Sequence, residues 1–180
     1  MIWPEANIGF SSPLRVHGEA LENWFFVFFA DSIVVRRDAS SNFRAIGDAE
    51  LKALAVDEEG RFFMGMQGST ACYAVNLSTE PDQEMSTLRD LFGSISVDLF
   101  NLAGRALQTL DWDRTHRFCG KCGGQMRVSE SDRSSRCDTC QLSFYARISP
   151  SIIVLVHHDR KVLLARNHRF PIGLFSTLAG

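Results

Sequence analysis

Four cysteines in two short pairs constrain this chain more than any other feature. Cys119 and Cys122 form the first C-x2-C pair, and Cys137 and Cys140 form the second. Each pair can bend around one metal ion and supply two thiolates, so the two pairs complete the tetrahedral ligand set of a zinc site. Because four protein ligands leave no position for water, we expect this Zn2+ to be structural and to fold the residues around it.

The two pairs differ in the residues that follow them. Gly120 and Gly123 follow the cysteines of the first pair, whereas the second pair has no such glycines. Glycine readily adopts the positive φ that a tight turn around a metal requires, so we expect the second turn to be less ideal. The alternatives are two disulfides or buried thiols, and the lack of a visible secretory signal favours the metal.

Composition limits the class of protein. The chain has 180 residues, of which 45% are hydrophobic and 22% charged, and its formal net charge is −2. These values are typical of a soluble globular protein of one to three small units, and they argue against a dedicated nucleic-acid binder. The longest apolar run, residues 24–30, is too short to cross a bilayer. We therefore expect a cytoplasmic protein without a membrane partner.

The first ninety residues indicate a small α+β unit. Alternating and apolar segments predict one strand pair over 24–30 and 33–36 and a second over 61–67 and 70–77. Between the two pairs, Asp48 is a candidate N-cap for a short helix that reaches Val56. We find no catalytic constellation in this part of the chain, which is typical of a scaffold or a partner surface.

Cys72, the fifth cysteine, lies inside the last of these predicted strands. Its alternating apolar neighbours predict a buried strand thiol, with a reactive thiol as the alternative.

From Ser94 the pattern becomes helical. Apolar residues recur at spacings of three and four, which places one stripe along a helix: Ile95, Leu99, Leu102, Ala106 and Leu110. The stripe predicts packing against the helix's own domain, and a dimer helix is the alternative.

After the cysteines, Ser151–Val156 forms a β-branched run that predicts a strand buried on both faces. A polar turn over His157–Arg160 and a returning strand over 161–166 follow. The neighbouring His157 and His158 invite a metal site, but adjacent residues of an extended chain point to opposite faces. Since a lone hairpin is marginally stable, we expect this sequence to be the front part of a longer protein.

Six segments carry a further signal, and they are residues 98–106, 116–123, 137–140, 144–145, 148–150 and 178–180. In their order and spacing over residues 94–180 they together resemble the NADH pyrophosphatase (NudC-like) branch of the Nudix hydrolases. The first ninety residues correspond to the variable amino-terminal domain of the family. The resemblance implies an α+β architecture with three parts. They are a mixed α/β domain over 1–112 that ends in the amphipathic helix, a four-cysteine zinc ribbon over 113–147, and the first strands of a Nudix α/β/α sandwich over 148–180.

The resemblance also implies an activity. It is the Mg2+- or Mn2+-dependent hydrolysis of the pyrophosphate in NAD(H), or in an NAD cap on RNA, to nicotinamide mononucleotide and a 5′-monophosphate. The resemblance further implies a homodimer. Gly180 matches the first glycine of the Nudix box, whose glutamates hold the metal ions in the family. The catalytic glutamates would therefore follow Gly180, so we expect no catalytic residue within this chain and no activity of the chain alone.

The same resemblance assigns candidate binding residues. Tyr145 matches a position where an aromatic ring stacks on a base, and Ile153 matches an apolar position of the same pocket. Asp132 stands where the family has a substrate-contacting glutamate, and Arg89 matches a basic contact if one residue is inserted. Ala179 matches the residue whose backbone carbonyl binds a divalent cation. For Tyr145, a core aromatic at the edge of the ribbon is the alternative.

A second class of function is a non-catalytic zinc-ribbon adaptor that binds nucleic acid or protein. Basic residues outnumber acidic ones between Asp113 and Arg147, which would allow contacts with phosphates. Stacking on the nucleobases of a single strand would require aromatic residues interleaved with these basic residues, and the sequence shows no such interleaving. A Nudix box after Gly180 would decide for the hydrolase.

Overall fold

The computed structural model describes residues 9–16, 20–54, 56, 60–129, 131–147 and 149–180. The described residues form two compact units, one ending at Ala146 and the other comprising Arg147–Gly180. The division into three domains remains a prediction. None of the described helices is long and apolar enough to cross a membrane.

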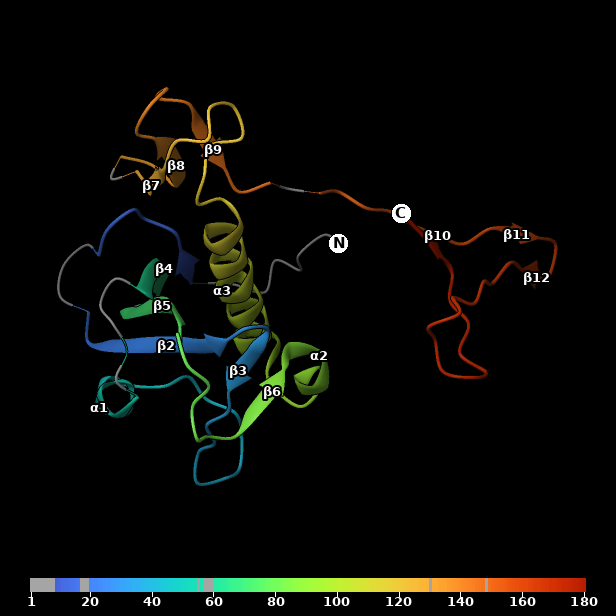
Figure 1. Cartoon of the computed structure of the whole chain (residues 1–180). Helices are drawn as coiled ribbons and strands as arrows, with labels where there is room; N and C mark the ends of the chain where they lie inside the picture. Colours follow the sequence, from blue (N-terminus) through green and yellow to red (C-terminus); the bar gives the residue numbers. More distant parts are fainter. Residues whose placement is uncertain (1–8, 17–19, 55, 57–59, 130, 148) are drawn as a thin grey trace. The chain divides into compact units, whose positions relative to one another are not determined.

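A six-stranded sheet forms the centre of the first unit (Figure 1). Its strands, in spatial order, are β1 (Phe10–Ser11), β4 (Arg61–Gln67), β5 (Thr70–Asn76), β2 (Glu22–Phe29), β3 (Ser32–Val34) and β6 (Met85–Thr87). The central strands β2 and β5 run parallel, and all other neighbours are antiparallel. Both predicted strand pairs are confirmed, because β2 pairs with β3 and β4 pairs with β5 as antiparallel hairpins.

Strand β2 has apolar residues on both faces because both faces of the sheet are covered. Phe26 and Phe28 belong to one buried cluster, and Phe25 and Val27 belong to the other. Side chains alternate between faces along a strand, so this continuous apolar run supplies two cores.

Helix α1 (Asp48–Ala53) contributes Leu51 to the second of these cores. A helix is confirmed here, although it ends at Ala53 and not at Val56 as predicted. The predicted N-cap is wrong: the cap is Gly47, and Asp48 is the first helical residue. The physical reason lies in two side chains. The Glu50 carboxylate accepts a hydrogen bond from the Gly47 backbone amide at 3.3 Å. The Asp48 carboxylate accepts one from the side-chain amide of Asn23 at 3.1 Å and so does not cap the helix.

The longest helix, α3 (Val97–Thr115), covers the other face and follows the short helix α2 (Leu88–Leu91). The Ser96 hydroxyl caps α3 by accepting from the Leu99 amide at 3.3 Å. Leu102, Ala106 and Leu110 are buried in the cluster that contains Phe26 and Phe28. The stripe therefore packs on its own domain, as predicted.

Cys72 lies in β5 and is fully buried. Burial raises the pKa of its thiol to about 11, so the thiol is protonated at neutral pH. The prediction of a buried strand thiol is confirmed.

The zinc-ribbon segment forms a small antiparallel sheet in the order β7-β8-β9. Its strands are β7 (Met126–Val128), β8 (Ser134–Cys137) and β9 (Ser143–Tyr145). Arg133, just before β8, donates hydrogen bonds to the backbone carbonyls of Phe63, at 3.0 Å, and of Pro13. One guanidinium thus ties the ribbon to the edge of the larger sheet.

The second unit contains two separate strand pairs. Strand β10 (Ile153–Val154) pairs with β13 (Leu178–Ala179), and β11 (His157–His158) pairs with β12 (Lys161–Val162). The prediction that Ser151–Val156 is a strand buried on both faces is wrong, because Ile153 is 74% exposed. A strand is buried only where a second layer covers it, and residues 149–180 contain two-residue strands and no helix.

Candidate metal centre and nucleotide-contact residues

The first cysteine pair lies in a turn held by backbone hydrogen bonds. The Gly123 amide donates to the Cys119 carbonyl at 2.8 Å, and the Cys119 amide donates to the Gly124 carbonyl at 2.8 Å. The Lys121 amide points at Cys119 Sγ from 3.4 Å. Gly123 has a φ of +73°, the conformation for which glycine was expected.

The second pair repeats this turn without glycine. The Gln141 amide donates to the Cys137 carbonyl at 3.0 Å, and the Cys140 amide points at Cys137 Sγ from 3.4 Å. Gln141 occupies the position equivalent to Gly123 and has a φ of +60°. A left-handed conformation costs a residue with a Cβ about 1–2 kcal/mol. The second turn is therefore the less ideal one, as predicted, although its hydrogen bonds match those of the first.

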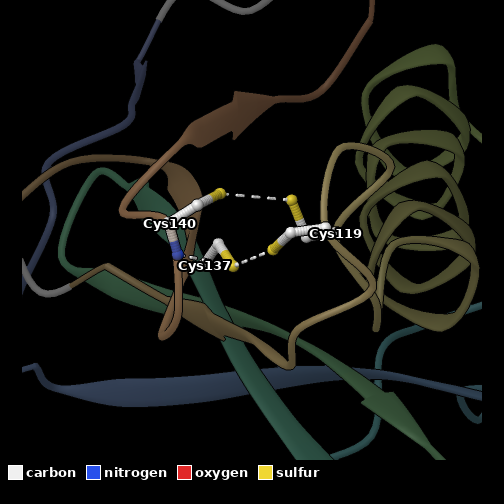
Figure 2. A group of neighbouring side chains, drawn as sticks. Cys119, Cys137 and Cys140 are labelled. Atoms are coloured by element: carbon white, nitrogen blue, oxygen red, sulfur yellow. Dashed lines mark hydrogen bonds between the residues drawn. The ribbon is translucent and has the colours of Figure 1, made fainter.

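The four sulfur atoms converge. Cys119 Sγ lies 3.6 Å from Cys140 Sγ, and Cys122 Sγ lies 3.5 Å from Cys137 Sγ. All four ligand atoms lie within 4.8 Å of one another, and Figure 2 shows the labelled thiols pointing toward a common centre. Cys119 and Cys137 are buried. These two side chains form a small apolar cluster with Met126, against which Phe144 packs.

These distances distinguish a metal site from disulfides. A disulfide requires an S–S distance of about 2.05 Å, and all four cysteines are unbonded. A tetrahedral zinc with Zn–S bonds of about 2.3 Å places its sulfurs about 3.8 Å apart. The observed separations of 3.5 and 3.6 Å fit the zinc tetrahedron.

The four thiols perturb one another's pKa values. The Cys140 amide, by donating to Cys137 Sγ, lowers the pKa of Cys137 to about 6. For Cys122 the Gly124 amide lowers the pKa, but the neighbouring Cys137 and Cys140 thiols raise it further, to about 12. Four negative charges this close are unfavourable unless a divalent cation lies between them.

Two of the predicted binding residues are in direct contact. The Tyr145 hydroxyl donates a hydrogen bond of 2.8 Å to Oδ2 of Asp132. The other carboxylate oxygen, Oδ1, accepts from the Ser134 hydroxyl at 2.6 Å and from its amide at 3.0 Å. The hydrogen bonds from Ser134 and Tyr145 lower the pKa of Asp132 to about 2, so this carboxylate is charged at neutral pH.

The ring of Tyr145 is available to a ligand. Its side chain is 58% exposed, so the alternative of a core aromatic is wrong. Because Asp132 holds the hydroxyl, the orientation of the ring is restrained while a face remains open to stacking.

Ile153 and Ala179 are brought together in the second unit. They are directly paired across β10 and β13. The flanking residues Ile152 and Gly180 exchange both backbone hydrogen bonds, at 2.9 and 3.2 Å. Ile153 and Ala179 are therefore a non-hydrogen-bonded pair, and the Ala179 carbonyl points away from β10. This orientation is compatible with a cation ligand.

Arg89 is the isolated candidate. It lies exposed in α2, and within the described part of the chain its side chain makes no hydrogen bond or ion pair with Asp132 or Tyr145.

The sequence analysis missed two residues that shape the site. Ser134 is 1% exposed and contributes two of the hydrogen bonds to Asp132. Gly124 lies where a Cβ would overlap Thr139 of the other turn, so the two turns pack backbone against side chain. The Asp-x-Ser spacing was a signal for Ser134, since an aspartate side chain often accepts a hydrogen bond from the backbone amide two residues on. A close approach between distant turns had no local signal.

Two family profiles match consecutive parts of this chain. Residues 22–112 match the NADH pyrophosphatase-like rudimentary NUDIX domain, and residues 114–145 match the NADH pyrophosphatase zinc ribbon domain. The chain belongs to the NADH pyrophosphatase family of NUDIX proteins. The resemblance and the fold class inferred from the sequence are thereby confirmed. The larger sheet with α3 is the rudimentary NUDIX domain, and the four cysteines lie in the zinc ribbon.

Curated relatives extend the similarity. The chain is 41% identical over 123 residues to the NAD-capped RNA hydrolase NudC of Deinococcus radiodurans, which covers 65% of this chain and 44% of the relative. It is 43% identical to the protein of that name from Stutzerimonas stutzeri, over 56% of this chain and 36% of the relative. For Pseudomonas putida strain W619 the identity is 49%, over 52% and 34%. The matched part spans less than half the length of these relatives.

The contact between Tyr145 and Asp132 predicts a measurable titration. The carboxylate accepts a hydrogen bond from the hydroxyl and would repel the phenolate, so it raises the pKa of Tyr145 above its ordinary value. The stabilisation from this hydrogen bond is present below the ordinary tyrosine pKa and is lost as the pH rises through the folded one. In a Tyr73→Phe background Tyr145 is the remaining tyrosine, and Asp132→Asn is expected to shift its phenolate absorbance titration to lower pH. An unshifted titration would show that the hydrogen bond does not form in solution.

Proposed function

We propose that this chain is the amino-terminal and zinc-ribbon part of a metal-dependent NAD(H) pyrophosphatase. The reaction is hydrolysis of the dinucleotide pyrophosphate to nicotinamide mononucleotide and AMP, and the same chemistry would remove an NAD cap from RNA. The observation that carries the proposal is the match of residues 22–112 to the rudimentary NUDIX domain, followed directly by the match of residues 114–145 to the family's zinc ribbon. The relatives are named for hydrolysis of NAD-capped RNA, which supports this substrate class.

The proposed role of the four cysteines is to hold one structural Zn2+. Their converging sulfurs and two matching turns support this assignment. The ribbon sheet is short, so the metal would supply the free energy that its small apolar cluster lacks.

Each unit has proposed contact residues of its own. In the unit that contains the ribbon, Tyr145 would stack on a base, with Asp132 fixing its hydroxyl. In the other unit, Ile153 would contribute an apolar contact. Arg89 would contact the substrate from α2. The Ala179 carbonyl would bind Mg2+ or Mn2+, which when bound neutralises phosphate oxygens and activates water. The glutamates of a Nudix box are expected after Gly180.

Product analysis tests the proposal. The complete protein, incubated with Mg2+ and either NADH or NAD-capped RNA, is expected to release nicotinamide mononucleotide together with AMP or a 5′-monophosphate end. Residues 1–180 alone are expected to release neither, while retaining one equivalent of zinc. Release of nicotinamide in place of the mononucleotide would reject a pyrophosphatase.

The adaptor alternative makes a different prediction, since a non-catalytic ribbon would leave both substrates intact in the complete protein. The match over residues 22–112 to a NADH pyrophosphatase-like domain favours the hydrolase. The proposal also includes that the complete protein is a homodimer and that it acts in the cytoplasm. Measuring its molar mass in solution and its location in the cell would test these two points.

A further inference from the structure

A hollow of about 430 Å³ lies where the last turns of α3 pass the end of β5. Its apolar lining includes Phe62, at the start of β4, and Leu110 of α3, which both belong to the larger hydrophobic cluster. Ser78 and Thr79, which follow β5, add hydroxyl groups. Apolar walls with a few polar groups, enclosing a volume of this size, are typical of sites for small organic ligands.

The position of the hollow in the sheet is one where ligands commonly bind. Strands β2 and β5 run parallel, and Leu77, the residue after β5, donates its amide to the Phe28 carbonyl of β2 at 2.7 Å. Asn76 and Leu77 line the hollow, so it lies at the carboxyl end of this parallel pair. Open sheets with parallel strands bind their ligands outside the carboxyl ends of the strands. The topology therefore points to a ligand independently of the lining residues.

Two charged side chains from the end of α3 and the residues after it line the hollow without a hydrogen-bonding partner. They are Asp113 and Arg117, and neither side chain makes a hydrogen bond or ion pair with any residue that the structure describes. Burial raises the pKa of the Asp113 carboxyl, and the nearby charge of Arg117 lowers it in part. Arg114 also lines the hollow, but Asp111 already pairs with it at 2.7 Å. A ligand with both a hydroxyl donor and an anionic group would satisfy Asp113 and Arg117 together.

These groups correspond to the three parts of a nucleoside 5′-monophosphate. A carboxylate such as Asp113 accepts hydrogen bonds from ribose hydroxyls, as the acidic residue of a dinucleotide site does. A guanidinium such as Arg117 binds phosphate oxygens through charge-assisted hydrogen bonds, which are stronger than neutral ones. The ring of Phe62 and the side chain of Leu110 offer an apolar surface to the base.

We propose that this hollow is a second nucleotide site, which binds a nucleoside 5′-monophosphate with its phosphate on Arg117 and its ribose on Asp113. Asp113 lies between the segments that match the rudimentary NUDIX domain and the zinc ribbon. The hollow shares no lining residue with the proposed substrate contacts, so the inference goes beyond the proposed function. Both products of the proposed reaction belong to this class of ligand, which makes the site suited to a product that regulates the protein.

Calorimetric titration of the zinc-loaded chain tests the site without hydrolysis. AMP, nicotinamide mononucleotide and inorganic phosphate are titrated separately into residues 1–180. One equivalent of AMP or of nicotinamide mononucleotide is expected to bind, and the tighter of the two identifies the preferred base. Arg117→Gln is expected to weaken this binding by about tenfold or more, the usual effect of losing a hydrogen bond to a charged group. Binding of neither nucleotide would overturn the inference, and so would phosphate that binds as tightly as AMP, since that shows an anion site only.

The ribose contact has a test of its own. The unmodified chain is expected to bind AMP about tenfold more tightly than 2′,3′-dideoxy-AMP, because only AMP offers hydroxyl groups to Asp113. Asp113→Ala is expected to bind the two nucleotides equally. A merely structural defect would weaken both to the same extent and leave their ratio unchanged, so a preserved preference in Asp113→Ala would overturn the assignment.

Two control variants separate this hollow from other nucleotide contacts. Arg160→Gln, in the turn between β11 and β12, removes the same charge from another exposed position and is expected to leave AMP binding unchanged. Tyr145→Ala is also expected to leave it unchanged, and all variants should keep one equivalent of zinc. A loss of AMP binding in Tyr145→Ala but not in Arg117→Gln would place the nucleotide on the ribbon and overturn the inference. Failure of the complete protein to cleave NADH would reject the pyrophosphatase while leaving this binding result intact.

Discussion

Cys119→Ser is expected to abolish stoichiometric zinc binding and to unfold the ribbon. Cys119 is buried and lies 3.6 Å from Cys140 Sγ, so serine would leave three thiolates around a position built for four. Apparent zinc-binding energies in small four-ligand sites are about 10–16 kcal/mol, which greatly exceeds what a three-stranded sheet of ten residues or so can supply. Elemental analysis should give one zinc per chain for the unmodified protein and a value near zero for the variant.

The fifth cysteine provides the control. Cys72→Ala removes a buried thiol that lies in β5 and is outside the sulfur cluster, so one equivalent of zinc should remain. Limited proteolysis would then separate the two effects. Cleavage between residues 117 and 145 should appear in Cys119→Ser, while the larger sheet, which has its own core, remains protected. Full zinc content and unchanged protease resistance in Cys119→Ser would refute a structural metal, and so would two disulfides detected by mass.

The cluster could be predicted from the sequence because its determinants are local. A C-x2-C spacing fixes two ligands within a single turn, and only the meeting of the two turns depends on tertiary structure. Local patterns likewise predicted the hairpins and the stripe of α3, because strand alternation and helical periodicity are set by neighbouring residues. The contact of Tyr145 with Asp132 could not be predicted in this way. It depends on the register of β8 and β9, which places Ser134 opposite Tyr145.

Other features required tertiary information. The parallel pairing of β2 with β5 joins segments separated by β3, α1 and β4, and no local pattern encodes that order. The same limit explains the error at Ser151–Val156, where an apolar β-branched run predicts burial. Such a run shows that burial would be favourable, but it does not supply the covering layer. Arg133 was unremarkable in the sequence because its partners, two backbone carbonyls, carry no residue-specific signal.

Gly65→Ala is expected to destabilise the rudimentary NUDIX domain by about 3 kcal/mol. This glycine has a φ of +152° and lies beside a register shift in β4, opposite the point where β1 joins the sheet. A Cβ at this position would overlap the carbonyl oxygen of Ser11 and lie 2.7 Å from Cζ of Phe10. A backbone conformation so rarely adopted by residues with a Cβ costs about 1–3 kcal/mol, and forcing extra volume into a packed contact costs about 1–3 kcal/mol.

The loss should appear in thermal unfolding as a fall in Tm of about 10 °C or more for a domain of this size. Gly104→Ala in α3 is the matched control, since nothing lies within 4 Å of the position where its Cβ would be. Alanine is favoured over glycine in a helix interior, so this variant should gain about 0.5–1 kcal/mol. Opposite signs for the same chemical change would support the constrained surroundings of Gly65, which combine its positive φ with the close approach of β1. Equal effects of both substitutions would contradict both features, because each of them alone disfavours alanine at position 65.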